Sequence, residues 1–134
     1  MKKRIPTFEP IAISEESYGR QIREIFYVID NNKSIMLDIE GLPSDSQDEV
    51  IDIINRVACI RDYKVKIRWK LEGYTYGEIK PRGHRFFFFR AAGDTIVFFA
   101  YKKKTEIKKN TYKTLKKRKD EYEQQFNQTT PRDG

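Results

Sequence analysis

Residues 84–101 read HRFFFFRAAGDTIVFFAY and predict the centre of a β-sheet. Four consecutive phenylalanines, Phe86 to Phe89, have no polar residue between them, which is typical of a strand that is covered on both faces. Ala92-Gly93-Asp94 has the composition of a tight hairpin turn. Because a second β-type run follows at once, we predict two antiparallel strands, residues 84–90 and 95–101, joined by this turn.

The sequence before this hairpin predicts further strands. Residues 63–71 alternate apolar and basic side chains, and this period of two predicts an extended segment with one apolar and one cationic face. Residues 74–80 predict another strand, and Pro81-Arg82-Gly83 predicts the turn that leads into the phenylalanine run. Residues 25–29 read IFYVI and predict a separate strand that ends in turn chemistry.

Helical patterns surround these strands. Ser44 and Gln47 fit a capping box at the start of a helix over 45–59. Its apolar stripe consists of Val50, Ile51, Ile54, Val57 and Ala58. A short helical turn is expected over 34–40. A last helix begins near Thr105 or Asn110 and is mostly lysine outside its apolar side. That apolar side consists of Ile107, Thr111, Leu115, Tyr122 and Phe126.

These elements predict an α+β fold in which helices pack on one small antiparallel sheet and the C-terminal helix is basic. The chain has 134 residues, of which 38% are hydrophobic, and this length suits one domain. We expect the domain over residues 24–126 and a polar tail over 127–134. Residues 1–23 are expected to form a partly ordered extension, either a short helix or a mobile arm.

Charge is distributed unevenly. Residues 1–60 contain 7 basic and 11 acidic side chains, whereas residues 61–119 contain 19 basic and 5 acidic ones. Such clustering favours a surface that faces nucleic acid or another polyanion, and its alternative is a solvated face that keeps the protein soluble.

Several functional classes are excluded by composition. The single cysteine, Cys59, and the single histidine, His84, exclude an internal disulfide and any cysteine-cluster or multi-histidine metal site, and we expect no metal or cofactor. No apolar run is long enough to span a bilayer, and the basic start is not followed by the apolar stretch of a secretory signal. We therefore expect a cytoplasmic protein without a membrane partner.

Four motifs in order resemble one family. They are Tyr76-Gly77-Glu78-Ile79-Lys80, Arg85 with the four phenylalanines, residues 96–105, and a lysine-rich helix that ends in Asp120-Glu121-Tyr122. Over about residues 24–125 the chain resembles the HigB-like, phage-derived branch of the RelE/ParE toxin superfamily. The resemblance implies a type II toxin that cleaves mRNA in the ribosomal A site and that a small antitoxin, usually with a helix-turn-helix domain, blocks.

RNA cleavage without a metal needs a base for the 2′-hydroxyl, cations for the phosphate and an acid for the leaving oxygen. Arg85 matches the family arginine that stabilises phosphate, and a guanidinium can bind two phosphoryl oxygens; its alternative is a solvated arginine at the turn. Lys80 matches a basic family position and closes the preceding strand. Glu78 is a candidate base or an orienter of Arg85, with a cross-strand ion pair as the alternative. His84 is a candidate proton shuttle or a plain surface residue, and Tyr101 a stacking or proton-donating residue or part of the core.

Other basic residues are candidates for contacts with the RNA backbone. They are Arg82, Arg90, Lys102, Lys103, Lys104, Lys108 and Lys109. The chain departs from strongly active RelE-type enzymes, because the strand before Lys80 lacks their paired lysines and because Tyr112 and Tyr122 are both candidates for the C-terminal tyrosine. Three functions stay open: a ribosome-dependent endoribonuclease, a non-catalytic or gyrase-directed ParE-like toxin, and a general basic nucleic-acid-binding module.

Overall fold

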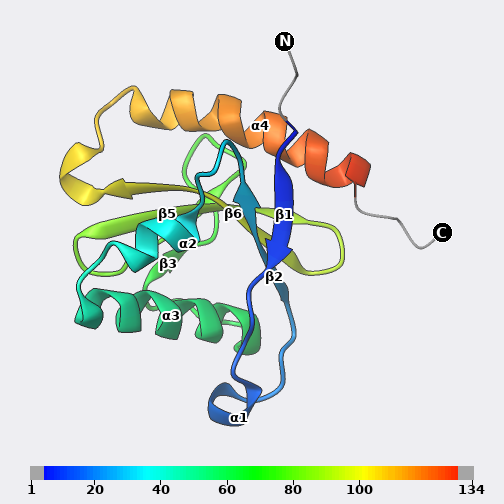
Figure 1. The fold of residues 1–134 in the computed structure, drawn as a ribbon, viewed down its shortest axis with the longest axis vertical. Coiled ribbons are helices and arrows are strands. Elements are labelled where there is room, and N and C mark those ends of the chain that lie inside the picture. Colours follow the sequence, from blue (N-terminus) through cyan, green and yellow to red (C-terminus); the bar gives the residue numbers. More distant parts are fainter. Residues whose placement is uncertain (1–4, 130–134) are drawn as a thin grey trace.

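The computed structural model describes residues 5–129; the basic start of the chain and the last five residues of the predicted tail lie outside the described residues. Within residues 5–129 the fold is α+β, with four α-helices and a six-stranded mixed sheet in the order β1-β2-β6-β5-β4-β3 (Figure 1). The strands are β1 (Thr7–Pro10), β2 (Glu24–Ile29), β3 (Ile67–Arg68), β4 (Gly77–Ile79), β5 (His84–Ala91) and β6 (Thr95–Lys103). The helices are α1 (Glu15–Tyr18), α2 (Ile35–Glu40), α3 (Ser44–Cys59) and α4 (Thr111–Thr129), with a 3-10 turn at Lys104–Glu106.

The phenylalanine hairpin is the centre of the sheet, as predicted. Strands β5 and β6 pair in antiparallel fashion, and β4 lies on the other side of β5. Phe86 and Phe88 belong to the core between the sheet and α3, whereas Phe87 and Phe89 belong to the core beneath α4. All four are fully buried, because helices cover both faces of this strand (Figure 1).

The prediction of an antiparallel sheet is wrong in one respect, because β2 runs parallel to β6. Ile25 lies opposite Ile96, and Tyr27 lies opposite Phe98. The hairpin leaves one edge of β6 unpaired, and β2 fills that edge. Parallel neighbours need a long crossover, and here it consists of α2, α3 and the β3–β5 strands.

The first residues of the described chain are part of the domain. β1 pairs with β2 as an edge strand, where Pro10 is tolerated, and the backbone N–H of Ile11 donates to the carbonyl of Ile25 at 2.8 Å directly after it. Further on, the backbone N–H of Ser14 donates to Asn55 Oδ1 on α3 at 2.7 Å. The Tyr18 hydroxyl donates to Asp52 at 2.6 Å. The segment predicted as an extension therefore packs against the sheet and α3.

The long extended segment predicted over 63–71 is not observed; only Ile67–Arg68 forms a strand. Val65, placed on the predicted apolar face, is 76% exposed because the chain turns there. The Trp69 indole N–H donates to the carbonyl of Tyr63 at 2.8 Å, which holds the two ends of the turn together. A tertiary contact thus overrides the period-two pattern.

Helix α3 follows its predicted limits, whereas α4 begins next to the predicted cap Asn110 and continues to Thr129, three residues into the predicted tail. The capping box at Ser44 does not form: Pro43 is the N-cap, and the Gln47 amide donates to the carbonyl of Leu42 at 2.8 Å. In α4 the predicted residues Leu115, Tyr122 and Phe126 are buried, but so is Lys119. The Lys119 ammonium is satisfied by Thr75 Oγ1 at 2.7 Å and Glu123 at 2.8 Å.

Candidate functional site

The register of the central hairpin brings the predicted cationic strand ends together. Arg85 lies directly opposite Lys102, and His84 lies opposite Lys103. The backbone N–H of Lys104 donates to the carbonyl of Gly83 at 3.0 Å, so the end of β6 also contacts the turn that precedes β5.

Side-chain direction divides these residues between the two faces of the sheet. Successive side chains of a strand point to opposite faces, and cross-strand partners share a face. Glu78 lies opposite Phe87, so Glu78 and Arg85 share the face that α4 covers, and Lys102 shares it as the partner of Arg85. His84 is on the opposite face, with the α3 core. The predicted catalytic residues are therefore two groups, not one.

Glu78 is the centre of the first group. Its side chain is 4% exposed, and its Oε2 lies 4.0 Å from Nε of Arg85 and also of Arg68. Its Oε1 is buried and accepts no hydrogen bond from the described residues. Burial raises the pKa of Glu78, and the charges of Arg85, Arg68 and Lys80 oppose the rise. The result is a carboxylate that binds a proton more tightly than an exposed one.

Arg85 is partly committed to the backbone. Its Nη1 donates to the carbonyl of His84 at 2.7 Å and to that of Pro81 at 3.3 Å. The side chain is 15% exposed. Within the described chain, Nη2 has no hydrogen-bond partner, so one edge of the guanidinium remains available to an anion.

Tyr112, in the first turn of α4, covers the same face, and its ring centroid is 6.5 Å from that of Phe87, the strand partner of Glu78. The Tyr76 hydroxyl donates to the backbone carbonyl of Tyr112 at 2.9 Å, which fixes this turn over the sheet. Burial raises the pKa of Tyr112, and the charge of Glu78 adds to the rise. Of the two tyrosines that the sequence left open, Tyr112 is the one near Glu78; the Tyr122 hydroxyl donates to Asp30 at 2.7 Å, on the other side of β6.

His84 and Tyr101 form the second group. Nδ1 of His84 and the Tyr101 hydroxyl are 2.8 Å apart, and the two rings stack with centroids separated by 5.7 Å. Burial raises the pKa of Tyr101, with smaller contributions from Asp38 and Glu106. Because this pair packs on the α3 side of the sheet, it does not face Glu78 and Arg85.

Glu49, on α3, was missed by the sequence analysis. Its Oε1 accepts the backbone N–H of Arg82 at 2.9 Å, and its Oε2 pairs with Lys66. This carboxylate therefore fixes the turn that sets the position of His84 and Arg85. No local motif marked it, because its partners are distant in sequence. Arg68 was likewise read only as part of an alternating segment.

The remaining predicted cations differ in position. Arg82, Lys103, Lys104, Lys108 and Lys109 are exposed around the same end of the sheet. Lys102 is half-buried and borders a cavity of about 140 Å³ beside the first turns of α4. Arg90 lies near the opposite end of β5, where its guanidinium stacks on Trp69 at 5.2 Å from the ring centroid. The structure therefore does not bring Arg90 to the others.

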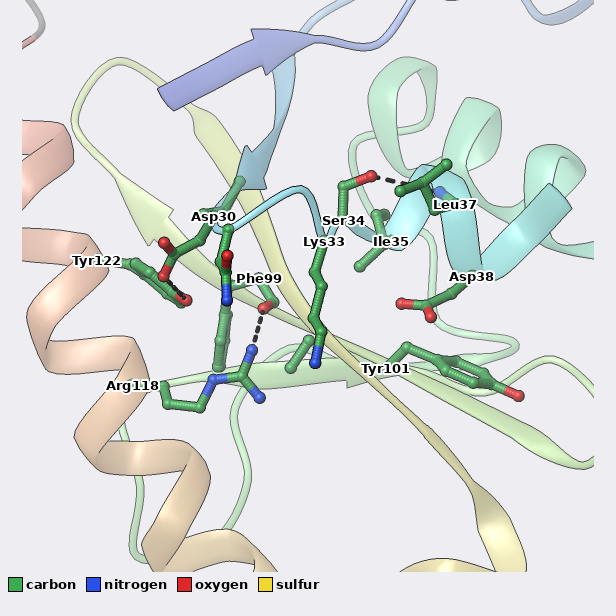
Figure 2. Close-up of a pocket in the computed structure, with 13 residues that line it drawn as sticks. Asp30, Lys33, Ser34, Ile35, Leu37, Asp38, Phe99, Tyr101, Arg118 and Tyr122 are labelled. Carbon is green, nitrogen blue, oxygen red and sulfur yellow. Dashed lines mark hydrogen bonds between the residues drawn. The ribbon is translucent and has the colours of Figure 1, made fainter. Parts of the chain in front are cut away.

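A larger cavity of about 510 Å³ lies on the far side of β6 (Figure 2). Its charged lining residues are Asp30, Lys33, Asp38 and Arg118, and Tyr101 forms part of one side. The Nη2 of Arg118 donates to the carbonyl of Phe99 at 3.5 Å. Of the residues that line this cavity, only Tyr101 and Tyr122 are functional candidates from the sequence, because α2 and α4 meet here only through the fold.

Comparisons with protein-family models, curated proteins and solved structures find no match for this chain. Among residues 5–129, no three histidine, cysteine, aspartate or glutamate side chains are grouped so that they could hold a metal ion. Over the same residues, no helix combines the length and the apolar character needed to cross a membrane.

Proposed function

We propose that the chain is a HigB-like toxin of the RelE/ParE superfamily, in a type II toxin–antitoxin system, and that it cleaves ribosome-bound mRNA without a metal ion. The resemblance of residues 24–125 motivates the proposal. One structural observation supports it. The Oε1 of the buried Glu78 carboxylate accepts no hydrogen bond from the described residues, and its Oε2 lies 4.0 Å from Nε of Arg85. Arg85 in turn lies opposite Lys102. A base and two cations therefore share one face of the sheet.

The chemistry assigns a step to each group. Glu78 takes the proton of the 2′-hydroxyl, and the 2′-oxygen attacks the adjacent phosphorus while the bond to the 5′-oxygen breaks. Arg85 and Lys102 stabilise the charge on the phosphoryl oxygens. Tyr112 gives its proton to the leaving 5′-oxygen, and Lys80 adds positive charge nearby. The raised pKa values suit these roles, since Glu78 becomes a stronger base and Tyr112 keeps its proton.

The exposed lysines beyond the strand ends provide sequence-independent binding. Lys103 is the last residue of β6, Lys104 follows it, and Lys108 and Lys109 precede α4. Each neutralised phosphate contributes a slope of about −0.7 to the dependence of log affinity on log salt for single strands. We expect binding of a short single-stranded RNA to fall steeply with salt, and a flat response would contradict a cationic RNA-binding surface.

The proposal includes the partners and the location of the protein. The ribosome supplies the mRNA in the cytoplasm. The cognate antitoxin is a small protein, usually with a helix-turn-helix domain, whose acidic amphipathic helix would cover the cationic surface.

Expression of the chain in bacteria tests the proposal. We expect growth arrest with new 5′ ends in translated messages, detected by primer extension. Glu78→Gln and Arg85→Ala are expected to relieve the arrest and to abolish the new ends while the fold is retained. Glu72→Gln and Arg61→Ala, at exposed positions, are the matched controls and should behave like the unmodified chain. Arrest without new 5′ ends would eliminate the ribonuclease function.

One observation favours a second candidate, a non-catalytic toxin that binds DNA gyrase or another partner. Two backbone carbonyls already accept from Arg85, which is therefore in part a structural residue. In that case Glu78→Gln would leave the arrest unchanged, and a gyrase supercoiling assay with the purified chain would show inhibition.

A further inference from the structure

The 510 Å³ cavity exists because β2 is shorter than the strand it accompanies. The parallel pairing ends where Tyr27 meets Phe98, and β6 continues to Lys103. The turn after β2, the start of α2 and the middle of α4 surround the uncovered part of β6 (Figure 2). Its volume is within the range of about 300–1,000 Å³ that small-molecule sites occupy.

Two cations border this cavity from different elements. Lys33 precedes α2, and Arg118 comes from α4. Neither forms an ion pair with any described residue, in contrast to Lys116 and Lys119 on the same helix. The backbone carbonyl of Phe99 accepts from Arg118 at 3.5 Å, and its guanidinium lies 5.9 Å from the Tyr122 ring centroid. The cavity thus has two positive charges that lack an ion-pair partner within residues 5–129.

The opposite part of the cavity has an acceptor and an aromatic wall. In Figure 2, Lys33 lies between Arg118 on one side and Asp38 with Tyr101 on the other. The Asp38 carboxylate makes no hydrogen bond or ion pair within the described chain. The Tyr101 hydroxyl is turned toward His84 at 2.8 Å, which fixes the ring. The other wall carboxylate, Asp30, already accepts from Tyr122 at 2.7 Å.

We propose that this cavity binds a guanine nucleotide, with its phosphate at Lys33 and Arg118, its base beside Tyr101, and its N1–H and 2-amino group donating to Asp38. A carboxylate only accepts hydrogen bonds, and the guanine edge is the one that presents two adjacent donors to it. Adenine and cytosine place an acceptor beside their amino group, which would repel Asp38. Uracil has a single N–H between two carbonyl oxygens.

The inference goes beyond the proposed function, because nucleotide binding needs neither Glu78 nor RNA cleavage. The guanine nucleotide has two sources with the same chemistry, a free nucleotide or a residue of a bound RNA. Arg118 also borders the smaller cavity beside Lys102, so the larger and the smaller cavity share this residue as a wall. An RNA strand that crosses Lys102 therefore has a route to this cavity.

Isothermal titration calorimetry of the full chain with GMP, AMP and inorganic phosphate tests the inference. GMP is expected to bind about 10-fold or more tightly than AMP, because a bidentate base contact gives discrimination of about this size. Asp38→Asn should remove the preference, and Arg118→Ala should weaken GMP and AMP alike. Asp48→Asn and Lys117→Ala, at exposed positions on α3 and α4, are the matched controls and should change neither affinity.

Equal affinity for GMP and AMP, or a guanine preference that survives Asp38→Asn in a protein with an unchanged circular dichroism spectrum, would overturn the inference. A trinucleotide with a central guanosine identifies the source: tighter binding than GMP assigns the cavity to RNA, and weaker binding assigns it to the free nucleotide. Glu78→Gln should bind GMP normally even if it never cleaves RNA, so failure here and failure of the proposed nuclease are distinguishable.

Discussion

Gly77→Ala should destabilise the fold, because Gly77 lies directly against the backbone at the end of β3. A Cβ atom at this position would lie 2.4 Å from the carbonyl oxygen of Arg68, 2.5 Å from that of Trp69 and 2.8 Å from Cζ of Phe88. Ordinary C···O contacts between strands are about 3.3–3.6 Å, so the neighbouring backbone must retreat by roughly 1 Å. Two of the three obstacles are backbone and cannot turn away.

Overpacking of this kind costs typically about 1–3 kcal/mol, and we expect the upper end because backbone must move. For a chain of this length, about 3 kcal/mol lowers the melting temperature by roughly 10 °C. The chain has one tryptophan, Trp69, whose ring packs on Phe88 with centroids 5.9 Å apart. Displacement of β3 should therefore also shift the tryptophan emission of the folded state to longer wavelength.

Gly83→Ala is the matched comparison. Gly83 has a φ of +79°, and a Cβ atom there would meet nothing within 4 Å. The substitution should cost only the left-handed backbone strain of about 1–2 kcal/mol and leave Trp69 emission unchanged. If Gly77→Ala unfolds like the unmodified chain and its emission does not move, then β3 does not lie against β4 as described.

Three further outcomes follow from buried polar groups. The pKa of Glu78 is raised, so its contribution to stability is present at low pH and is lost as the pH rises through that pKa. Glu78→Gln should therefore have a higher melting temperature than the unmodified chain near pH 8. Its melting temperature should also change less between pH 4 and pH 8. Tyr122→Phe removes a hydrogen bond to the carboxylate of Asp30 and should lower the free energy of unfolding in urea by about 2 kcal/mol. Arg23→Met leaves three backbone carbonyls at the end of α3 without their donor and should cost about 3 kcal/mol by the same measurement, whereas Arg20→Met, at an exposed position, should cost little.

The sequence predicts those elements whose signal is local. Four adjacent phenylalanines can only be buried on both sides, and the apolar stripe over 45–59 has one helical solution. The same period-two rule that predicts the strands also implies that His84 and Arg85 face opposite sides of the sheet. A grouping of the candidate residues by strand end ignores that alternation. It assigns to one face of the sheet residues that lie on two opposite faces.

The features that escape prediction depend on pairs distant in sequence. Glu49 and Arg82 are brought together by the packing of α3 against the β4–β5 turn. Lys119 is a residue type that is seldom buried, and its burial depends on Thr75, which no helical pattern reveals. The parallel pairing of β2 with β6 has no local signal either, because strand direction is fixed by the route of the chain between them.

That parallel pairing also determines where the larger cavity lies. Asn31 and Asn32 adopt left-handed conformations, with φ of 55° and 60°, and turn the chain away from β6 directly after β2 ends. Asparagine tolerates this region better than most residues, so the turn is encoded locally even though its consequence is not. Because β2 ends at this point, the last part of β6 is paired with β5 along one edge, where Lys102 lies opposite Arg85, and borders the open cavity along the other edge. A longer β2 would complete the ladder and close the cavity, so the position of this asparagine turn is the feature that leaves this edge of β6 open.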